Sequence, residues 1–131
     1  VTYGDSIFVA VSSSGTGQRV MTSLNGIDWT SRTAATKNYW SSVIYGDSTF
    51  VAVGSSGAVM TSPDGNDWTS RTAAAENYWY SVTYGNNIFV AVSSSGKGNR
   101  VMTSLDGIDW TSQEPAADNY WDSVTYGGGF F

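Results

Sequence analysis

The chain of 131 residues contains no cysteine and no histidine. Without cysteine it can form neither a disulfide nor a thiolate metal site, and its cysteine content does not indicate whether the protein resides in an oxidising or a reducing compartment. Without histidine it lacks the commonest general base of enzymes and the commonest ligand of transition metals. Serine is abundant, but a Ser-His-Asp triad is excluded because its histidine is missing.

Positive charge and long apolar runs are also scarce. The chain has 6 Lys and Arg against 11 Asp and Glu, and its net charge of −5 disfavours binding to nucleic acid or to an anionic membrane. No apolar run approaches the roughly 18 residues of a membrane-spanning helix, and no N-terminal signal peptide is recognisable. A mature secreted fragment would lack that peptide too, so the compartment stays undetermined and an extracellular location is compatible with the sequence.

What the chain does contain is apolar and aromatic material for a core. Hydrophobic residues make up 40% of it and aromatic residues 15%, a composition that disordered tails and linkers do not have. The length favours a single domain that covers residues 1–131.

The sequence is a repeat. The segment VTYGDSIFVAV at residue 1 returns as VIYGDSTFVAV at 43 and VTYGNNIFVAV at 82, and a partial copy, VTYGGGFF, begins at 124. The repeats therefore span residues 1–42, 43–81 and 82–123, with a partial repeat at 124–131. The middle copy is three residues shorter within a Ser/Gly-rich segment, which indicates a surface loop.

Each repeat predicts four short strands. In the middle copy they are residues 41–45, 49–54, 58–62 and 67–72, separated by the turn signals YGDS, SSG and PDG. The second strand is apolar on both faces, whereas the third and fourth are more polar and alternate. This pattern predicts an all-β fold, a β-propeller arc of three four-stranded antiparallel blades plus the first strand of a fourth.

The turn before the fourth strand carries a resemblance to a known family. It reads SLNGIDW at 23–29, SPDGNDW at 62–68 and SLDGIDW at 104–110. The S-x-D-G-x-x-W pattern resembles the Asp-box of BNR and sialidase-type β-propellers, and the whole repeat resembles blades of uncharacterised bacterial proteins of that group. The Asp-to-Trp spacing is one residue shorter than in the usual Asp-box, and the first copy has Asn25 in place of Asp. In sialidases this turn lies away from the active site.

We expect a structural role for this turn. An Asp or Asn side chain can accept hydrogen bonds from its own turn, and the following glycine can adopt a positive φ, while the Trp packs the turn onto the blade. A calcium site is the alternative, but one or two carboxylates per turn fall short of the roughly six oxygen ligands that calcium takes. We therefore predict no metal and no cofactor. The predicted turn residues are Asn25, Asp64, Asp106, Trp29, Trp68 and Trp110.

An enzyme is the alternative class. The sialidase-like resemblance implies an arginine triad, a Tyr nucleophile with a Glu partner, and an Asp acid. The four arginines occur in pairs at equivalent repeat positions, which spreads them around a ring, and Glu76 and Glu114, the only glutamates, lie in connectors. No pair of carboxylates is fixed across one bond, as a glycosidase requires. We predict that the chain is not an enzyme, with a sialidase or glycosidase-type fragment as the alternative.

A binding site is predicted on the rim where two kinds of loop share a face. The connection between blades carries NYW, and the loop between the second and third strands carries SSSGTGQR, GSSGA or SSSGKGNR. Aromatic faces beside Arg and Asn suit sugar rings, so carbohydrate is the leading ligand class. The other interpretation, to which the sequence gives more weight, is that the NYW aromatics wedge between blades and close the core, with Asn capping the loop. The candidate residues are Trp40, Trp79, Trp121, Tyr39, Tyr78, Tyr120, Asn38, Asn77, Asn119, Arg19 and Arg100.

Three blades cannot close a propeller, so copies of the chain are the predicted partners. A homodimer with a six-bladed ring is favoured and a homotrimer with nine blades is second; an excised part of a longer propeller is the alternative. In a ring the N-terminal strand is expected to take the strand-one place, leaving residues 124–131 over the rim or at an outer edge. The predicted function is a self-assembling binding or scaffold module, and a purely structural role is a further alternative.

Overall fold

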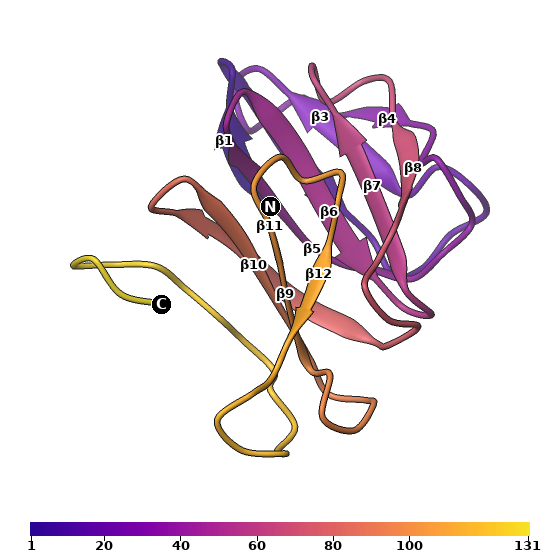
Figure 1. The fold of residues 1–131 in the computed structure, drawn as a ribbon. Helices are drawn as coiled ribbons and strands as arrows, with labels where there is room; N and C mark the ends of the chain where they lie inside the picture. Colours follow the sequence, from indigo (N-terminus) through magenta and orange to yellow (C-terminus); the bar gives the residue numbers. More distant parts are fainter.

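The computed structural model describes residues 1–131 and contains twelve strands and no helix. The strands form three four-stranded antiparallel sheets, each built from consecutive strands (Figure 1). Blade 1 consists of β1 (Thr2–Gly4), β2 (Ile7–Val11), β3 (Val20–Ser23) and β4 (Thr30–Arg32). Blade 2 consists of β5 (Trp40–Gly46), β6 (Thr49–Gly54), β7 (Ala58–Ser62) and β8 (Thr69–Thr72). Blade 3 consists of β9 (Trp79–Gly85), β10 (Ile88–Ser93), β11 (Val101–Ser104) and β12 (Thr111–Gln113).

The fold class predicted from the repeat is confirmed. The second and third strands of blade 2 have the predicted bounds, 49–54 and 58–62, and the first is longer by one residue at each end. The fourth strand starts two residues later than predicted because Asp67 and Trp68 belong to the preceding turn. No helix is present that is long and apolar enough to cross a membrane.

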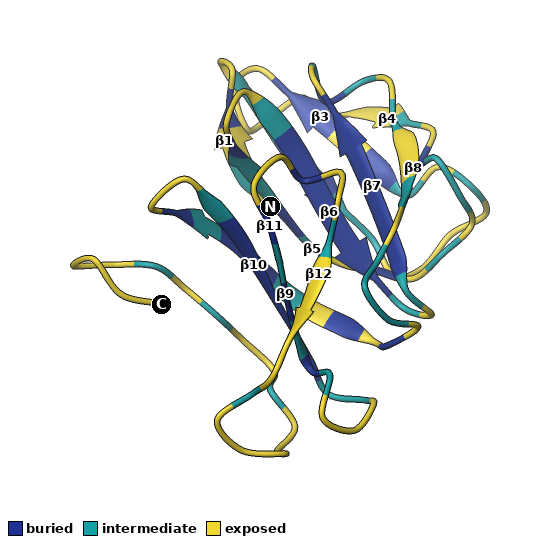
Figure 2. Cartoon of the chain, in the orientation of Figure 1, coloured by how far each residue is buried: buried dark blue, intermediate teal, exposed yellow.

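The prediction that the third strand alternates between buried and exposed positions is wrong. All five residues of β7 are buried, the polar Thr61 and Ser62 included. Blade 2 lies between two other blades, so both faces of its inner strands are covered (Figure 2). The two hydroxyls keep partners, because Arg71 donates to Thr61 Oγ1 over 2.9 Å and Ser62 donates to Asp64 Oδ1 over 3.0 Å. Only β8, the outer strand, is largely exposed.

The core lies between the blades. One apolar cluster joins blades 1 and 2 and contains Val9, Trp40 and Phe50, and a second joins blades 2 and 3 and contains Val51, Trp79 and Phe89. Adjacent residues of β6 therefore serve different interfaces, since Phe50 faces one neighbour and Val51 faces the other. This explains why the second strand of each repeat has to be apolar on both faces.

A glycine and a tyrosine fix the contact between successive first strands. At Gly46 an added Cβ would lie 2.2 Å from Cγ of Tyr84, and at Gly4 it would lie 2.0 Å from Cγ of Tyr45. Each tyrosine ring also packs on the phenylalanine of its own hairpin, with centroids 4.5 Å apart for Tyr84 and Phe89. We call this arrangement the Gly–Tyr contact. It leaves no room for any side chain on the glycine.

The C-terminal segment 124–131 takes the strand-one place beside blade 3. The backbone N–H of Val124 donates to Ser81 Oγ over 3.2 Å, as the N–H of Val82 donates to Ser42 Oγ over 3.2 Å one blade earlier. Tyr126 makes the Gly–Tyr contact with Gly85. The segment turns through a single bridge between Gly127 and Phe130 and pairs with no other strand. Its expected place in a closed ring stays a prediction.

Candidate functional site

Two kinds of loop are joined on one face of the molecule. The backbone N–H of Trp40 donates to the carbonyl of Ser12 in the β2–β3 loop over 3.3 Å, and the N–H of Ser55 in the β6–β7 loop donates to the carbonyl of Tyr39 over 2.9 Å. The connection into β5 is thus held between the loops of blades 1 and 2. The connection into β9 is held in the same way, because Gly57 donates to the carbonyl of Asn77 over 2.9 Å.

Two of the three tryptophans of the NYW segments are buried between blades. Trp40 is 1% exposed and Trp79 is 0% exposed, and each belongs to a core cluster. The Trp79 indole donates to the carbonyl of Ala75 over 3.1 Å. Trp121 is half-buried, at the side of blade 3 where no further blade packs. The expectation that Trp40 and Trp79 offer their ring faces to a ligand is therefore corrected, because neighbouring blades already cover both rings.

The tyrosines of the same segments are accessible. Tyr39, Tyr78 and Tyr120 are each more than half exposed. Tyr39 and Tyr78 lie in the connections between blades, each directly before a first strand that begins with a buried tryptophan. The aromatic surface that a ligand can reach on this rim comes from tyrosine.

Two arginines of the rim stack on the tyrosine rings. Arg19 donates from Nε to the carbonyl of Gly15 over 2.9 Å and from Nη1 to the carbonyl of Asn38, and its guanidinium lies 5.1 Å from the ring centroid of Tyr39. Arg100 likewise donates from Nε to the carbonyl of Gly96 over 2.9 Å and lies 4.8 Å from the ring centroid of Tyr120, and it forms an ion pair of 3.1 Å with Asp118. Arg100 is buried. Both guanidinium groups are therefore engaged in holding loops.

The three asparagines of the NYW segments differ in environment. Asn77 is buried and donates to the carbonyl of Asn99 over 2.8 Å, which bridges blades 2 and 3. Asn38 is half-buried and donates to Thr36 Oγ1 over 3.1 Å. Asn119 is exposed. Of the three, Asn77 is a loop-bridging residue that a ligand cannot reach.

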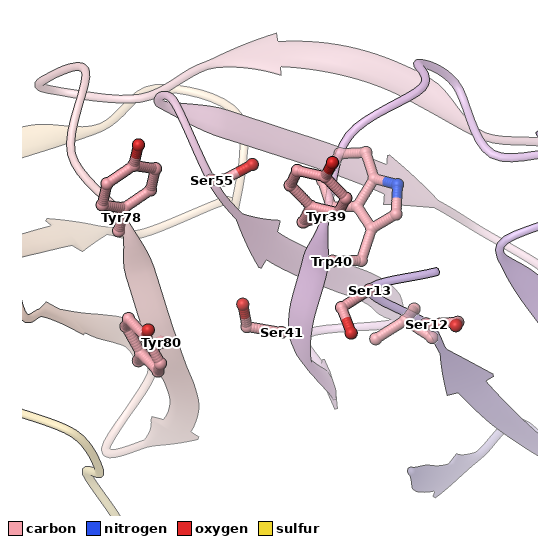
Figure 3. Close-up of a pocket in the computed structure, with 9 residues that line it drawn as sticks. Ser12, Ser13, Tyr39, Trp40, Ser41, Ser55, Tyr78 and Tyr80 are labelled. Atoms are coloured by element: carbon pink, nitrogen blue, oxygen red, sulfur yellow. The ribbon is translucent and has the colours of Figure 1, made fainter. Parts of the chain in front are cut away.

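A hollow of about 750 Å³ opens on this rim at the centre of the chain. Tyr39 and Tyr78 stand on either side of Ser55, and Tyr80 lies beneath Tyr78 (Figure 3). We call this feature the rim hollow. Its lining residues are Val11, Ser12, Ser13, Tyr39, Trp40, Ser41, Ser55, Tyr78 and Tyr80.

Sequence reasoning missed Tyr80 and the serines of the rim hollow. Tyr80 occupies a position at which the repeats differ, since Ser41 and Asp122 stand at the equivalent places. A comparison of repeats that looks for shared residues passes over such a position. The signal that would have found Tyr80 is the exposed aromatic residue beside a buried tryptophan on the first strand.

The Asp-box-like turns hold themselves together. Asp64 Oδ1 accepts the backbone N–H of Asn66 over 2.9 Å and that of Asp67 over 3.1 Å. These backbone hydrogen bonds lower the pKa of Asp64 below 3.8, with the N–H of Asn66 the largest cause. The pKa of Asp106 is lowered in the same manner, chiefly by the backbone N–H of Asp109.

Asn25 makes the same turn without a charge. Its Oδ1 accepts the backbone N–H groups of Ile27 and Asp28, each over 2.9 Å. The tryptophan that follows each turn donates its indole N–H to the carbonyl of the turn glycine, over 3.2 Å for Trp29, 3.0 Å for Trp68 and 3.0 Å for Trp110. No group of three or more Asp or Glu side chains lies close enough together to hold a metal ion.

Comparison with known proteins shows the fold. No family model matches the chain, and no curated protein sequence matches it. The chain is similar to a structure of YCF48 from Cyanidioschyzon merolae, with a TM-score of 0.60 and 18% identity over 93% of this chain and 44% of that one. It is also similar to YCF48 bound to a D1 peptide, with a TM-score of 0.56 and 16% identity over 83% of this chain and 37% of that one.

The chain thus spans less than half the length of either YCF48 structure. At these identities the likeness establishes a β-propeller fold and carries no residue roles with it.

Proposed function

We propose that the chain is a non-enzymatic binding module whose ligand occupies the rim hollow, with carbohydrate as the leading ligand class. The observation that carries this proposal is the grouping of Tyr39, Tyr78 and Tyr80 with serine hydroxyls around one opening. Tyrosine rings offer flat apolar faces on which the C–H face of a sugar can stack, and hydroxyls can both donate and accept. Concave sites of this size that combine aromatic and a few polar groups are the usual form of ligand sites.

A glycan array tests the carbohydrate proposal. The wild-type chain is expected to bind a subset of the array, and Tyr78→Ala is expected to reduce that signal about tenfold because it removes one wall of the rim hollow. Tyr120→Ala is the matched control, since Tyr120 is an exposed rim tyrosine that does not line the hollow. An array without any signal, or an equal loss in both variants, would contradict the proposal.

A peptide is the second candidate ligand. The observation that favours it is the similarity in fold to YCF48 in a structure with a bound D1 peptide. Tyrosine-rich surfaces also suit peptides, because tyrosine is enriched at protein interfaces. Binding of the chain to a peptide library, lost in Tyr78→Ala and retained in Tyr120→Ala, would place a peptide in the rim hollow instead of a sugar.

We further propose that the open sides of blades 1 and 3 are covered by further blades, which copies of the 131-residue chain supply. Ile27 in blade 1 is 80% exposed, whereas its equivalent Ile108 in blade 3 is 41% exposed beside blade 2. An added Cβ at Gly65 or Gly107 would meet a valine of the preceding blade, Val9 or Val51, while Gly26 meets only Phe8 of its own blade. The same turn therefore lacks a neighbour in blade 1. A six-bladed dimer is the favoured ring.

A further inference from the structure

The rim hollow contains no charged side chain. Its lining consists of three tyrosines, four serines, one tryptophan and one valine. The chain as a whole has 17 charged residues, 11 of them acidic. The hollow is therefore an uncharged and hydroxyl-rich site on an acidic protein, and a ligand inside it meets hydroxyl groups, aromatic rings and one valine side chain.

One cation, Arg19, contacts a residue that lines the rim hollow. Arg19 stacks on Tyr39, which lines the rim hollow, but Arg19 itself does not line it. Its Nε and Nη1 groups donate to the carbonyls of Gly15 and Asn38. Arg19 would have to leave its stacked position on Tyr39 to meet a carboxylate or sulfate ester in the hollow. Arg19 is thus a positioning residue that holds the ring of Tyr39, and no cationic side chain lines the hollow.

An anionic group would lose its hydration in the rim hollow without gaining an opposite charge, which is costly. A neutral saccharide would exchange hydrogen bonds with water for hydrogen bonds with the serine and tyrosine hydroxyls and would stack on the rings. We propose that the rim hollow selects neutral saccharides and rejects sialylated, uronic-acid and sulfated ones. This inference rests on the carbohydrate function proposed above and names its substrate class.

Because Tyr80 occurs in only one of the three repeats, this lining is found at one place in the chain. One blade further on, Asp122 stands at the place of Tyr80, and Tyr80 at the place of Ser41. An equivalent site there would have a carboxylate at the place of Tyr80 and a tyrosine at the place of Ser41. We therefore assign one neutral-saccharide site to each chain, between Tyr39 and Tyr80.

The test is titration calorimetry of the full chain with matched saccharides. A panel of neutral oligosaccharides is compared with the same oligosaccharides bearing a terminal sialic acid or a sulfate. We expect the neutral member of each pair to bind at least about tenfold more tightly. Equal or tighter binding of the charged members would overturn the selectivity while leaving the carbohydrate function in place. A panel without any binding would remove both.

Variants locate the site. Tyr80→Asp imports the residue of the next repeat and is expected to weaken neutral binding about tenfold or more, whereas Tyr80→Phe keeps the ring and is expected to stay within about threefold of wild type. Tyr80 is exposed, and thermal melts would verify that both variants fold. Unchanged affinity in folded Tyr80→Asp would place the saccharide elsewhere and overturn the assignment.

Discussion

Single side chains in this molecule act mainly on the loop that carries them. Asp64 accepts the N–H groups of Asn66 and Asp67 in its own turn, and Arg19 donates to the carbonyl of Gly15 in its own loop and to that of Asn38 in the connection into β5. Such local hydrogen bonds give a loop a defined shape without regular secondary structure. The charged side chain of Arg19, which the sequence suggests as a ligand contact, already has hydrogen-bond partners within the protein.

The lowered pKa values of Asp64 and Asp106 predict an acid-sensitive stability. Both groups have a folded-state pKa below the 3.8 of the unfolded chain, so their contribution is complete above that pH and is lost as pH falls through the folded-state pKa. The melting temperature is expected to be nearly constant from about pH 7 to about pH 5 and to fall below about pH 4. Thermal melts across this range measure it.

The first blade supplies the control for this prediction, because Asn25 makes the same turn without a titrating group. The double variant Asp64→Asn, Asp106→Asn is therefore expected to fold normally at neutral pH and to lose less of its stability in acid. If the melting temperature of the double variant falls with decreasing pH as steeply as that of wild type, the two turns are not the source of the acid sensitivity.

At the scale of elements, the blades are held by contacts between strands that lie about 40 residues apart. Phe50 and Val51, adjacent on β6, face different neighbours, and Trp40 and Trp79 fill the two spaces between blades. The Gly–Tyr contact then sets how closely the first strands approach. Removing the space at the glycine is a sharper probe of this interface than truncating a core residue.

Gly46→Ala tests the Gly–Tyr contact. The new methyl group would lie 2.2 Å from Tyr84 Cγ, so blades 2 and 3 have to separate, and we expect a loss of about 3 kcal/mol in the free energy of unfolding. Gly127→Ala is the matched control: it has open space around its Cβ position and is expected to change stability by less than about 0.5 kcal/mol. Neither glycine has a positive φ, so backbone strain does not enter the comparison. Urea unfolding of both variants measures the difference, and an equal effect would mean that the contact is not tight.

The repeat shows what sequence could predict at this scale. The apolar run 49–54 required cover on both sides and so predicted stacked blades, and the structure has them. The place of Trp40 was undetermined because a rim ligand site and a core wedge both predict one tryptophan per blade. The burial of Thr61 was missed because polar residues at alternating positions suggest a solvent face, and only the presence of a third blade removes that face. Tyr80 lines the rim hollow, but the repeats have different residues at its position, so a search for residues shared by the repeats does not find it.

At the scale of the whole molecule, the two open sides are complementary. The turn around Gly26 lacks the valine that Gly65 and Gly107 find on a preceding blade, and blade 3 carries Val90 at the place equivalent to Val9 and Val51. Joining these sides would repeat an interface that the molecule already contains twice. It would also place the N-terminal strand and residues 124–131 in competition for one strand-one position.

Light scattering with size-exclusion chromatography tests closure of the ring. We expect the 131-residue chain to have twice the 14.0 kDa mass of a single copy, because two sets of three blades give a six-bladed ring. A chain that lacks residues 124–131 is expected to keep that mass and nearly the same melting temperature, since the N-terminal strand is already paired with β2. A monomeric or trimeric wild type would contradict the dimer, and loss of the oligomer on deletion would make the C-terminal segment the closing strand.

The Gly–Tyr contact also has a consequence for how such a chain can change in length. Each 39- to 42-residue unit carries both halves of the contact, the glycine for the blade that follows and the tyrosine for the blade that precedes. A tandem duplication of the coding segment for one unit would therefore produce a blade that fits its two neighbours at once, with no new interface to be selected. An insertion within a first strand would separate a glycine from its tyrosine, whereas the three-residue difference in the Ser/Gly-rich loop of the middle unit leaves the contact intact. Genes for chains of this kind are expected to grow and shrink by whole units, so that blade number is the character most easily altered by recombination.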